Sequence, residues 1–228
     1  MKIILLMVGS ILLINVFFLR LYCSIQKRRD SGEKGNLFFR FLRKFFDYFY
    51  HYMYGWMHYC CLVTGHIPSN RVRNFFYKFV FLMDIQSDTC ISGGCEFRSP
   101  WNIHLKKCVV QANCVLDGRS SVYVGNNVVF GTGVHIWTQE HDVNDSLFRV
   151  LKKNSQPVII NDRAWICSDS TILPGVIVGE GAVLASKAVA TKNCQEYSIY
   201  AGIPARKIGE RNRDLIYELP GKPHWHFY

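Results

Sequence analysis

The stretch "WICSDSTILPGVIVGEGAVLASKAVATKN", residues 165–193, carries an apolar residue at every sixth position. An α-helix repeats near 3.6 residues and a strand at 2, so neither explains this period. One slot of the hexad is apolar, and the slot four residues later holds small or slim side chains. The first slot contains Ile160, Ile166, Ile172, Val178, Leu184 and Ala190, and the second contains Ala164, Ser170, Val176, Ala182, Ala188 and Cys194.

This hexad predicts a coil with three short flat sides and about 18 residues per turn. Each side directs one large residue inward, and the small residue fits the crowded corner. The Asn, Asp, Gly, Lys and Ser residues between the two slots suit tight corners. Stacked coils pair their backbones as parallel strands, so we expect a mainly β fold, a parallel β-helix built as a solenoid of hexapeptide repeats. Ordinary buried strands would not keep a six-residue phase for six cycles.

The same phase occurs upstream, although one segment breaks it. Large residues lie at Val124, Phe130 and Ile136, with Val128 and Val134 in the small slots. Across residues 101–121 the register is ambiguous, because Leu105, Val109, Val115 and Val122 do not share one frame. Cys108 and Cys114 are six apart, so we expect them to stack on adjacent sides of the coil rather than to bind a metal. The period does not reveal the handedness.

The segment "PVIINDRAWICSDSTILPGVIVGEGAVLASKAVATKNCQEYSIYAGIPARKI", residues 157–208, resembles the C-terminal half of the left-handed β-helix acyltransferases. That family includes galactoside, maltose and serine O-acetyltransferases and enzymes that modify bacterial surface polysaccharides. The resemblance covers about residues 100–210, and "LDGRSSVYVGNN" and "GVHIWTQEHDV" are closer to the polysaccharide-modifying branch. Its landmarks are Trp165-Ile166, Leu173-Pro174-Gly175, Thr191-Lys192 and Gly202-Ile203-Pro204-Ala205; the departures are Cys167, where a glycine is usual, and Ser186-Lys187, where Gly-Ser is usual.

The resemblance implies a left-handed coil, a homotrimer and acetyl-coenzyme A as the acyl donor, bound along the coils between two subunits. The donor contacts that carry over are Trp165, Ser168, Ala185, Thr191, Lys192 and Arg206. Backbone amides near Ser168 and Ala185 would bind the pantetheine, whereas Lys192 and Arg206 suit phosphates. Asn113 and Asp117 resemble residues that contact the acceptor in sugar acetyltransferases.

The hexads stop after Ile136, and "WTQEHDVNDSLFRVLKKNSQP", residues 137–157, intervenes before Val158 resumes them. Functional residues favour such excursions from a rigid scaffold. Acyl transfer to a hydroxyl group requires a base, and histidine, which titrates near neutral pH, is the usual one. The resemblance places a catalytic histidine here, so we predict that His141 is the general base. Asp142 or Glu140 could orient its ring.

Two other functions remain open at this stage. A zinc-dependent carbonic anhydrase of the trimeric β-helix type would need three histidines, and His104, His135 and His141 are available. That family lacks the Thr-Lys and Gly-x-Pro-Ala motifs found here. A non-catalytic scaffold or binding module with the same fold is the second alternative. Bound zinc, or failure to bind acetyl-coenzyme A, would separate these alternatives from the transferase.

The front of the chain is basic and apolar. Residues 1–89 contain 12 Lys and Arg against 5 Asp and Glu, and they hold most of the net charge of +10. Ile3–Leu19 is an uncharged run of 17 residues, about 25 Å as a helix, just short of a hydrocarbon core of about 30 Å. No cleavage site follows it, so we expect a retained membrane anchor. The basic cluster Lys27–Arg29 places the rest of the chain on the cytoplasmic side of a bacterial inner membrane.

Residues 37–63 are rich in aromatic residues. A second span over 45–63 is possible, but its Asp and His residues favour helices lying in the membrane interface. We therefore divide the chain into an anchor (1–35), amphipathic helices (36–88), the β-helix (89–210) and a tail (211–228). We expect that removal of residues 1–35 leaves the catalytic unit folded. Nine cysteines without a Cys-x-x-Cys pair fit reduced thiols.

These observations predict a membrane-anchored O-acetyltransferase that uses acetyl-coenzyme A and needs no metal. The acceptor is expected to be a sugar hydroxyl in a surface polysaccharide or its lipid-linked precursor. Nucleic acid is a poor explanation of the positive charge, because that charge lies beside an apolar anchor.

Overall fold

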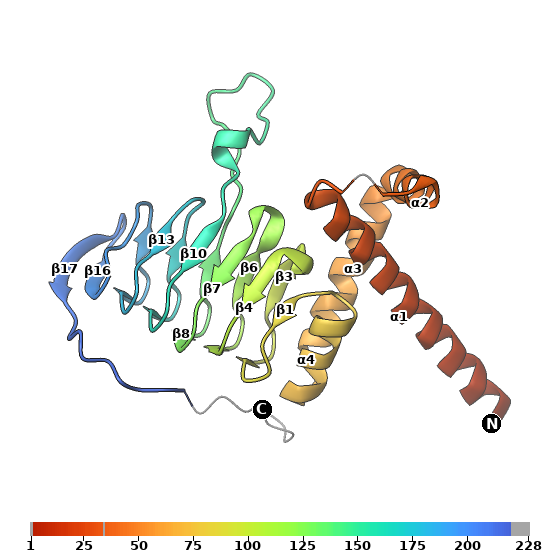
Figure 1. Cartoon of the computed structure of the whole chain (residues 1–228), viewed down its shortest axis with the longest axis horizontal. Helices are drawn as coiled ribbons and strands as arrows, with labels where there is room; N and C mark the ends of the chain where they lie inside the picture. Colours follow the sequence, from red (N-terminus) through yellow and green to blue (C-terminus); the bar gives the residue numbers. More distant parts are fainter. Residues whose placement is uncertain (1, 34, 220–228) are drawn as a thin grey trace.

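The computed structural model describes residues 2–33 and 35–219, with side chains from Gly9 onward. A group of helices at the N-terminal end is followed by a long parallel β-solenoid (Figure 1). The last residues of the expected tail, 220–228, lie outside the described residues. The prediction of a mainly β fold built as a parallel β-helix is confirmed.

The solenoid has three sheets, and each coil from β1 to β15 contributes one strand to each sheet, whereas β16 and β17 extend one sheet alone. Sheet 1 contains β1 (Asp84–Ile85), β4 (Ile103–Leu105), β7 (Val122–Val124), β10 (Val158–Ile160) and β13 (Ile177–Val178). Sheet 2 contains β2 (Cys90–Ile91), β5 (Cys108–Val110), β8 (Val128–Phe130), β11 (Trp165–Ile166), β14 (Val183–Leu184), β16 (Ser198–Ala201) and the antiparallel β17 (Arg206–Glu210). Sheet 3 contains β3 (Glu96–Arg98), β6 (Val115–Asp117), β9 (His135–Ile136), β12 (Thr171–Ile172) and β15 (Val189–Ala190).

The interior of the solenoid is filled by the hexad residues. Both slots of the hexad are buried from residue 124 to residue 194, so the period predicts the core correctly. Cys108 and Cys114 are also buried in the stack, and all nine cysteines are free thiols.

The ambiguous register across residues 101–121 has a structural cause. Short 3₁₀ turns, η1 (Pro100–Asn102) and η2 (Gly118–Ser120), lengthen the corners that follow β3 and β6. Leu105 and Val122 therefore face the core, whereas Val109 and Val115 are only half-buried. Four aliphatic residues that face two directions cannot share one hexad frame.

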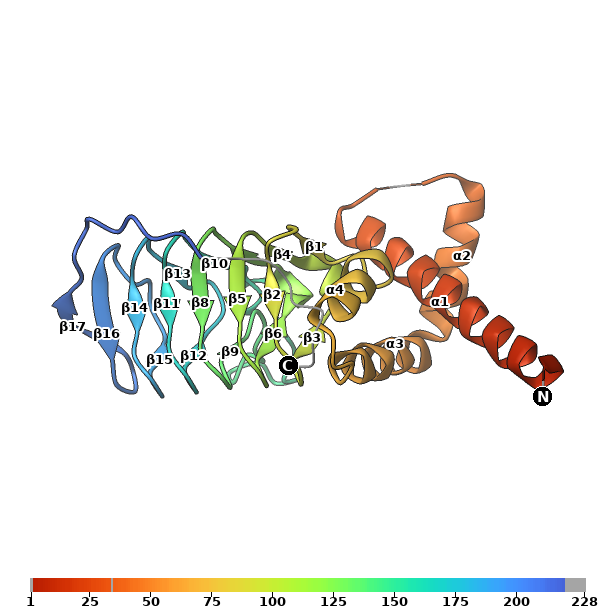
Figure 2. The same cartoon turned by 90° about the horizontal axis from the view of Figure 1, so that it is seen from below.

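The helices α3 (Tyr50–Gly65) and α4 (Asn70–Phe79) cover the open end of the first coil (Figure 2). Arg73 and Asn74 of α4 donate to the carbonyls of Ile91 and Thr89 at 2.8 and 2.7 Å. The two helices thus satisfy backbone groups that an uncovered edge of a solenoid would leave exposed. The first strand lies at Asp84–Ile85, before the expected domain boundary at residue 89.

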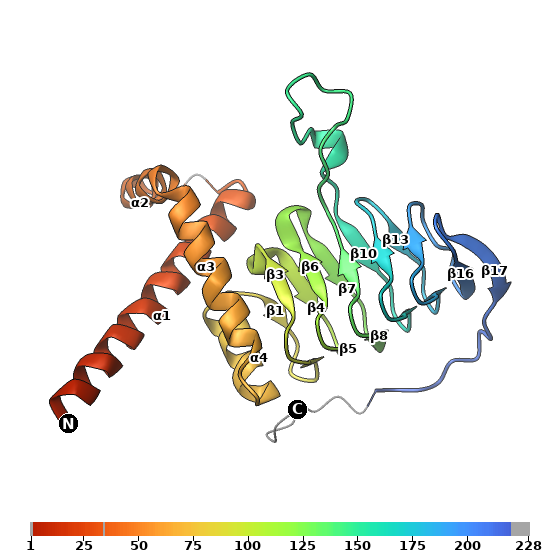
Figure 3. The same cartoon turned by 180° about the vertical axis from the view of Figure 1, so that it is seen from behind.

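Helix α1 (Lys2–Asp30) has two halves with different surroundings. Its described first half is apolar and exposed, and it projects away from the solenoid (Figure 3). Its second half is buried at Tyr22, Cys23 and Gln26, and Asp30 accepts a hydrogen bond from the indole of Trp101 at 2.8 Å. The expectation that residues 1–35 lie apart from the catalytic unit is therefore wrong for the second half of α1.

Only α1 among the described helices is long and apolar enough to cross a membrane, over Gly9–Asp30. Side chains 3–8 of the expected span lie outside the described residues. Residues 45–63 do not form one continuous helix, because Phe49 separates α2 (Leu37–Tyr48) from α3, which begins at Tyr50. Since α3 also packs on β3, these residues belong to the cap of the solenoid rather than to a second span.

Candidate active site

The excursion of residues 137–157 rises from the corner between sheets 3 and 1 (Figure 1). It contains the predicted base His141 and is therefore called here the catalytic loop. Its two ends run side by side as a short stem. Gln139 pairs with Ser155, the amide of Glu140 donates to Asn154 at 3.0 Å, and the 3₁₀ turn η3 (Lys152–Asn154) precedes Ser155. His141 is therefore the first residue beyond a hydrogen-bonded stem, and the stem limits the positions that it can occupy.

The ring of His141 is held on one side of the loop. Its Nδ1 lies 2.5 Å from the carbonyl oxygen of Phe148, and the two rings stack at 4.4 Å with an angle of 6° between them. A carbonyl oxygen can only accept, so Nδ1 must carry the proton. The lone pair of a neutral His141 is then on Nε2. An exposed histidine in this tautomer can take a proton from a hydroxyl group.

Asp142 does not orient this ring in the structure. Its carboxylate contacts Lys153 at 2.5 Å and accepts from the amide of Asn144 at 2.9 Å. The hydrogen bond from Lys153, aided by that from the Asn144 amide, lowers the pKa of Asp142. Asp142 thus closes the loop, and the Phe148 carbonyl occupies the position expected for an acidic partner of the histidine. Glu140 is exposed.

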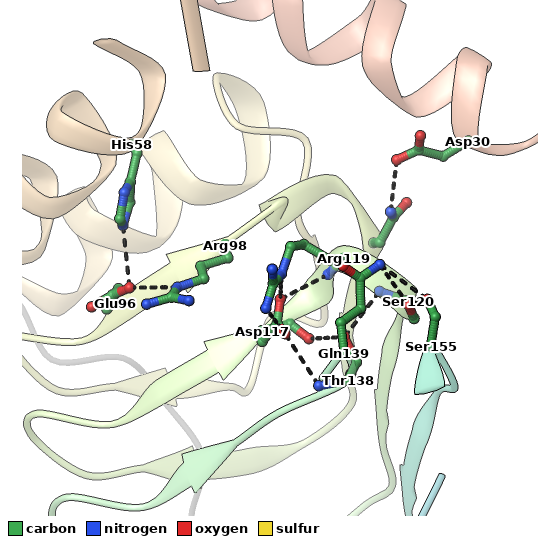
Figure 4. A network of polar contacts seen from close by, with 11 residues as sticks. Asp30, His58, Glu96, Arg98, Asp117, Arg119, Ser120, Thr138, Gln139 and Ser155 are labelled. Atoms are coloured by element: carbon green, nitrogen blue, oxygen red, sulfur yellow. Dashed lines mark hydrogen bonds and ion pairs between the residues drawn. The ribbon is translucent and has the colours of Figure 1, made fainter. Parts of the chain in front are cut away.

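Asp117, expected to contact the acceptor, is fully buried at the foot of the catalytic loop (Figure 4). Its carboxylate accepts from Arg119 Nε and Nη2 at 2.8 and 2.9 Å and from the amide of Thr138 at 3.2 Å. A carboxylate that is both buried and paired in this way presents no oxygen to a substrate. The structure therefore does not place Asp117 among the acceptor contacts.

The predicted residues divide between the two edges of sheet 3. Backbone hydrogen bonds connect the corners between sheets 2 and 3 in a ladder: Asn113 to Gly93, Gly133 to Ala112, Asp169 to Thr132, and Lys187 to Ser168. Asn113 and Ser168 belong to this ladder, and Ala185 lies at the same corner, directly after β14. This side of sheet 3 is called here the 2/3 edge. His141, Asp142, Thr191 and Lys192 follow strands of sheet 3, at the opposite 3/1 edge. One chain therefore does not bring His141 and the 2/3 edge to the same side of sheet 3.

The residues expected to contact the donor differ in their exposure and in their hydrogen bonds. The amide of Ala185 donates to the carbonyl of Tyr200 at 2.8 Å, so it is not a free donor for pantetheine. Trp165 is 47% exposed on sheet 2, and the side chains of Thr191, Lys192 and Arg206 are exposed. Lys187, which departs from the family pattern, has a positive φ of 61° at a corner of the 2/3 edge.

The three histidines of the carbonic anhydrase alternative lie apart on this chain. His104 is on sheet 1, where its Nδ1 is 3.0 Å from Asp84, and His135 is on sheet 3. No group of three potential metal-binding side chains occurs within residues 9–33 and 35–219.

Two features of the site could not be read from the sequence. The Phe148 carbonyl and Thr138 were missed, since a backbone contact and a single threonine leave no pattern. The Asp-x-Arg spacing of Asp117 and Arg119 was an available signal for their ion pair.

Comparisons with curated proteins connect this geometry to a family. A chloramphenicol acetyltransferase of Klebsiella aerogenes is 37% identical over 163 residues, which cover 69% of this chain and 75% of the relative. The chain belongs to the hexapeptide-repeat acetyltransferase family. A putative acetyltransferase of Schizosaccharomyces pombe is 32% identical over 57% of this chain and 63% of its own length, and a galactoside O-acetyltransferase of Escherichia coli is 30% identical over 51% and 58%. The chain thus spans less than two thirds of these last two relatives, and no family profile matches it.

Solved structures of the family show the same fold. A galactoside acetyltransferase in complex with coenzyme A has a TM-score of 0.61 at 24% identity, covering 73% of this chain and 85% of that chain. A hexapeptide-repeat acetyltransferase of Vibrio cholerae complexed with acetyl-coenzyme A has a TM-score of 0.59 at 19% identity, covering 67% and 83%. The prediction of the family, and with it of an acetyltransferase as the class of enzyme, is confirmed.

Proposed function

We propose that the protein transfers the acetyl group of acetyl-coenzyme A to a sugar hydroxyl, with His141 as the general base. The observation that carries this proposal is the hydrogen bond between His141 Nδ1 and the Phe148 carbonyl, which leaves Nε2 as the basic atom. The donor is supported by family membership and by the Vibrio relative, which binds acetyl-coenzyme A.

The proposed reaction is a direct transfer. Nε2 of His141 removes the hydroxyl proton of the acceptor as its oxygen attacks the thioester carbonyl. The carbon–sulfur bond of the tetrahedral intermediate then breaks, and the coenzyme A sulfur takes the proton back from the imidazolium. The Phe148 carbonyl accepts from Nδ1 throughout and stabilises the charged ring, as a carboxylate does in many histidine bases.

The proposed donor path follows the 2/3 edge past Ser168 and Ala185. Lys192, which lies at the 3/1 edge, and Arg206, which begins β17, remain the proposed phosphate contacts. Because His141 of the same chain lies across sheet 3 from the 2/3 edge, a complete site needs the catalytic loop of one copy beside the 2/3 edge of another. This separation supports a homotrimer with sites shared between neighbouring subunits. Asn113 lies on the 2/3 edge two coils closer to the helices than Ser168, and it remains a proposed contact of the acceptor.

The relatives suggest two classes of acceptor. Galactoside and maltose acetyltransferases are named for sugars, whereas the Klebsiella relative, which is 37% identical to this chain, is named for chloramphenicol. An enzyme that acts on a small soluble acceptor does not require the helices α1–α4 that cap the solenoid. The presence of this helical cap therefore favours an acceptor at a membrane. A hydroxyl of a small aromatic drug is therefore the second candidate, favoured by the Klebsiella relative.

A bacterial inner membrane is the proposed location, with the catalytic domain on the cytoplasmic side. Ile11, Leu13 and Phe17 of α1 are exposed, as are Trp56 of α3 and Phe75 of α4. An apolar groove of about 590 Å³ lies between these three helices. Such exposed apolar area beside a net positive charge suits an anionic bilayer. A membrane-bound enzyme can reach a surface polysaccharide or its lipid-linked precursor.

The full-length protein, purified in detergent and incubated with radiolabelled acetyl-coenzyme A, provides the test. We expect label in galactosides, maltosides or lipid-linked glycans from the host membrane, at the hydroxyl oxygen. Transfer to chloramphenicol alone would support the second candidate. Acetyl-coenzyme A binding without transfer to any hydroxyl acceptor would contradict the proposed function.

A further inference from the structure

We infer that Asp117 is a positioning residue that fixes the stem of the catalytic loop and, through the stem, the place of His141. This inference rests on the proposed role of His141. It assigns to Asp117 a task other than contact with the acceptor, and it adds Thr138 and Arg119 to the residues on which the reaction depends.

The first observation is the saturation of the Asp117 carboxylate. The side chain is 0% exposed, and its oxygens accept from the amide, Nε and Nη2 of Arg119 and from the amide of Thr138. The two guanidinium bonds form a fork, which fixes the carboxylate plane as well as its position. Buried charge requires such pairing, so the carboxylate has one allowed orientation.

The second observation is that this carboxylate holds the foot of the loop. Thr138 is 0% exposed; its hydroxyl donates to the Asp117 carbonyl at 2.9 Å and accepts from the amide of Ser120 at 3.0 Å. Gln139 Nε2 donates to the hydroxyls of Ser120 and Ser155, both at 3.0 Å. The outgoing and returning strands of the stem are thus fastened to the corner that contains Asp117 (Figure 4).

A neighbouring contact ties the stem to the helical cap. The guanidinium of Arg98 lies 4.9 Å from the ring centre of Trp137, the first residue of the loop. Arg98 Nε is 2.8 Å from Glu96, and Glu96 is 3.4 Å from His58 of α3. Arg98 and Asp117 are neighbours in the β3–β6 register. The Arg98–Glu96 and Arg119–Asp117 ion pairs therefore act at the same end of sheet 3.

The distance in sequence from this foot to the base is short. Thr138 precedes His141 by three residues. The two residues between them, Gln139 and Glu140, are each paired with the returning strand of the stem. A displacement of the foot is therefore passed to the imidazole with little chain to absorb it. Misplacement of a catalytic group by about 1 Å can cost about 100-fold in rate.

The test compares two substitutions at Thr138 in the full-length enzyme. Thr138→Val keeps the shape but removes the hydroxyl, whereas Thr138→Ser keeps the hydroxyl. We expect kcat to fall about 10- to 100-fold in Thr138→Val, with the KM for acetyl-coenzyme A unchanged and most of the rate retained in Thr138→Ser. Asp117→Asn, which loses the charge of the fork, should behave like Thr138→Val.

Deuterium exchange distinguishes positioning from general stability. In Thr138→Val and Asp117→Asn, peptides over residues 137–142 should exchange faster, while those over residues 158–166 of the next coil should not. Equal acceleration of both peptides would overturn the inference, because the residues would then stabilise the whole coil. A raised acceptor KM at unchanged kcat would also overturn it, by making Asp117 an acceptor contact.

The proposed function can fail separately from this inference. If His141→Ala transfers acetyl groups as fast as the parent, the general base is wrong. Faster loop exchange in Thr138→Val together with an unchanged kcat would instead overturn the positioning role alone. The pH dependence of kcat/KM should keep its midpoint in Thr138→Val, since positioning changes the rate but leaves the titrating base intact; a shifted midpoint contradicts the inference.

Discussion

At the scale of single residues, the activity should depend on His141 far more than on its stacking partner. His141→Asn should lower kcat by about 100- to 10,000-fold, the typical contribution of a positioned base, without loss of donor binding. Phe148→Ala is the matched control, because it removes the stacked ring but keeps the backbone carbonyl that accepts from Nδ1. Steady-state kinetics and calorimetric binding of acetyl-coenzyme A measure both effects. A parental rate in His141→Asn would disprove the assignment.

Asp142 gives a prediction about pH. Lys153 and the Asn144 amide lower the pKa of Asp142 below its ordinary value of 3.8. A carboxyl group whose pKa is lower in the folded than in the unfolded chain stabilises the fold at pH values above its unfolded-state pKa. This stability is lost as the pH falls through its folded-state pKa. Lys153→Met should therefore raise the pKa of Asp142 toward its ordinary value, and carboxyl NMR titration of parent and variant measures this change. Identical titration curves would show that the ion pair does not form in solution.

The residue scale also shows where sequence reasoning ends. The place of His141 outside the coils could be predicted, because it stands where the hexads stop. Its hydrogen-bond partner could not be predicted, because a backbone carbonyl of Phe148 has no residue type to search for. The burial of Asp117 could not be predicted either, since it depends on how η2 turns the chain and brings Arg119 back onto the carboxylate.

At the scale of elements, α1 should divide into a dispensable half and a required half. Removal of residues 1–18 should leave a folded enzyme, because the buried side chains of the helix begin at Leu19, and the core contacts that are lost involve only partly buried ones such as Val16 and Phe18. Removal of residues 1–30 deletes Leu19, Tyr22 and Ile25, each contributing roughly 1.5–3 kcal/mol of burial. That loss approaches the whole stability of many domains, roughly 5–15 kcal/mol. Thermal unfolding and acetyl transfer of the two truncations provide the measurement, and equal melting temperatures would contradict the division.

The solenoid was predictable element by element, whereas the cap was not. From residue 122 onward, a hexad fixes each short strand from local sequence, since the same slot faces inward in every coil. The docked half of α1 has no such signal. The apolar run Ile3–Leu19 of the same helix predicts a membrane anchor, but Tyr22, Cys23 and Gln26 further along are buried, and the ring of Tyr22 packs on Trp101, which is distant in the chain.

At the scale of the whole molecule, the catalytic loop and the 2/3 edge lie across sheet 3 from one another. A shared site predicts that two inactive variants restore activity when they form mixed trimers. His141→Ala lacks the base, and Ala185→Trp places a large side chain in the proposed donor path. Each should be inactive alone, since every site then lacks one half.

Co-expression of these two variants at equal levels should recover about one quarter of the parental activity, because one site in four would join an intact loop to an intact 2/3 edge. Mixing the variants after separate purification is the control, since subunits that do not exchange restore nothing. Size-exclusion chromatography with light scattering checks that the mixed species is a trimer. Complete inactivity of co-expressed trimers that contain both variants would place each site within a single chain, and His141 would then have to act at its own 3/1 edge.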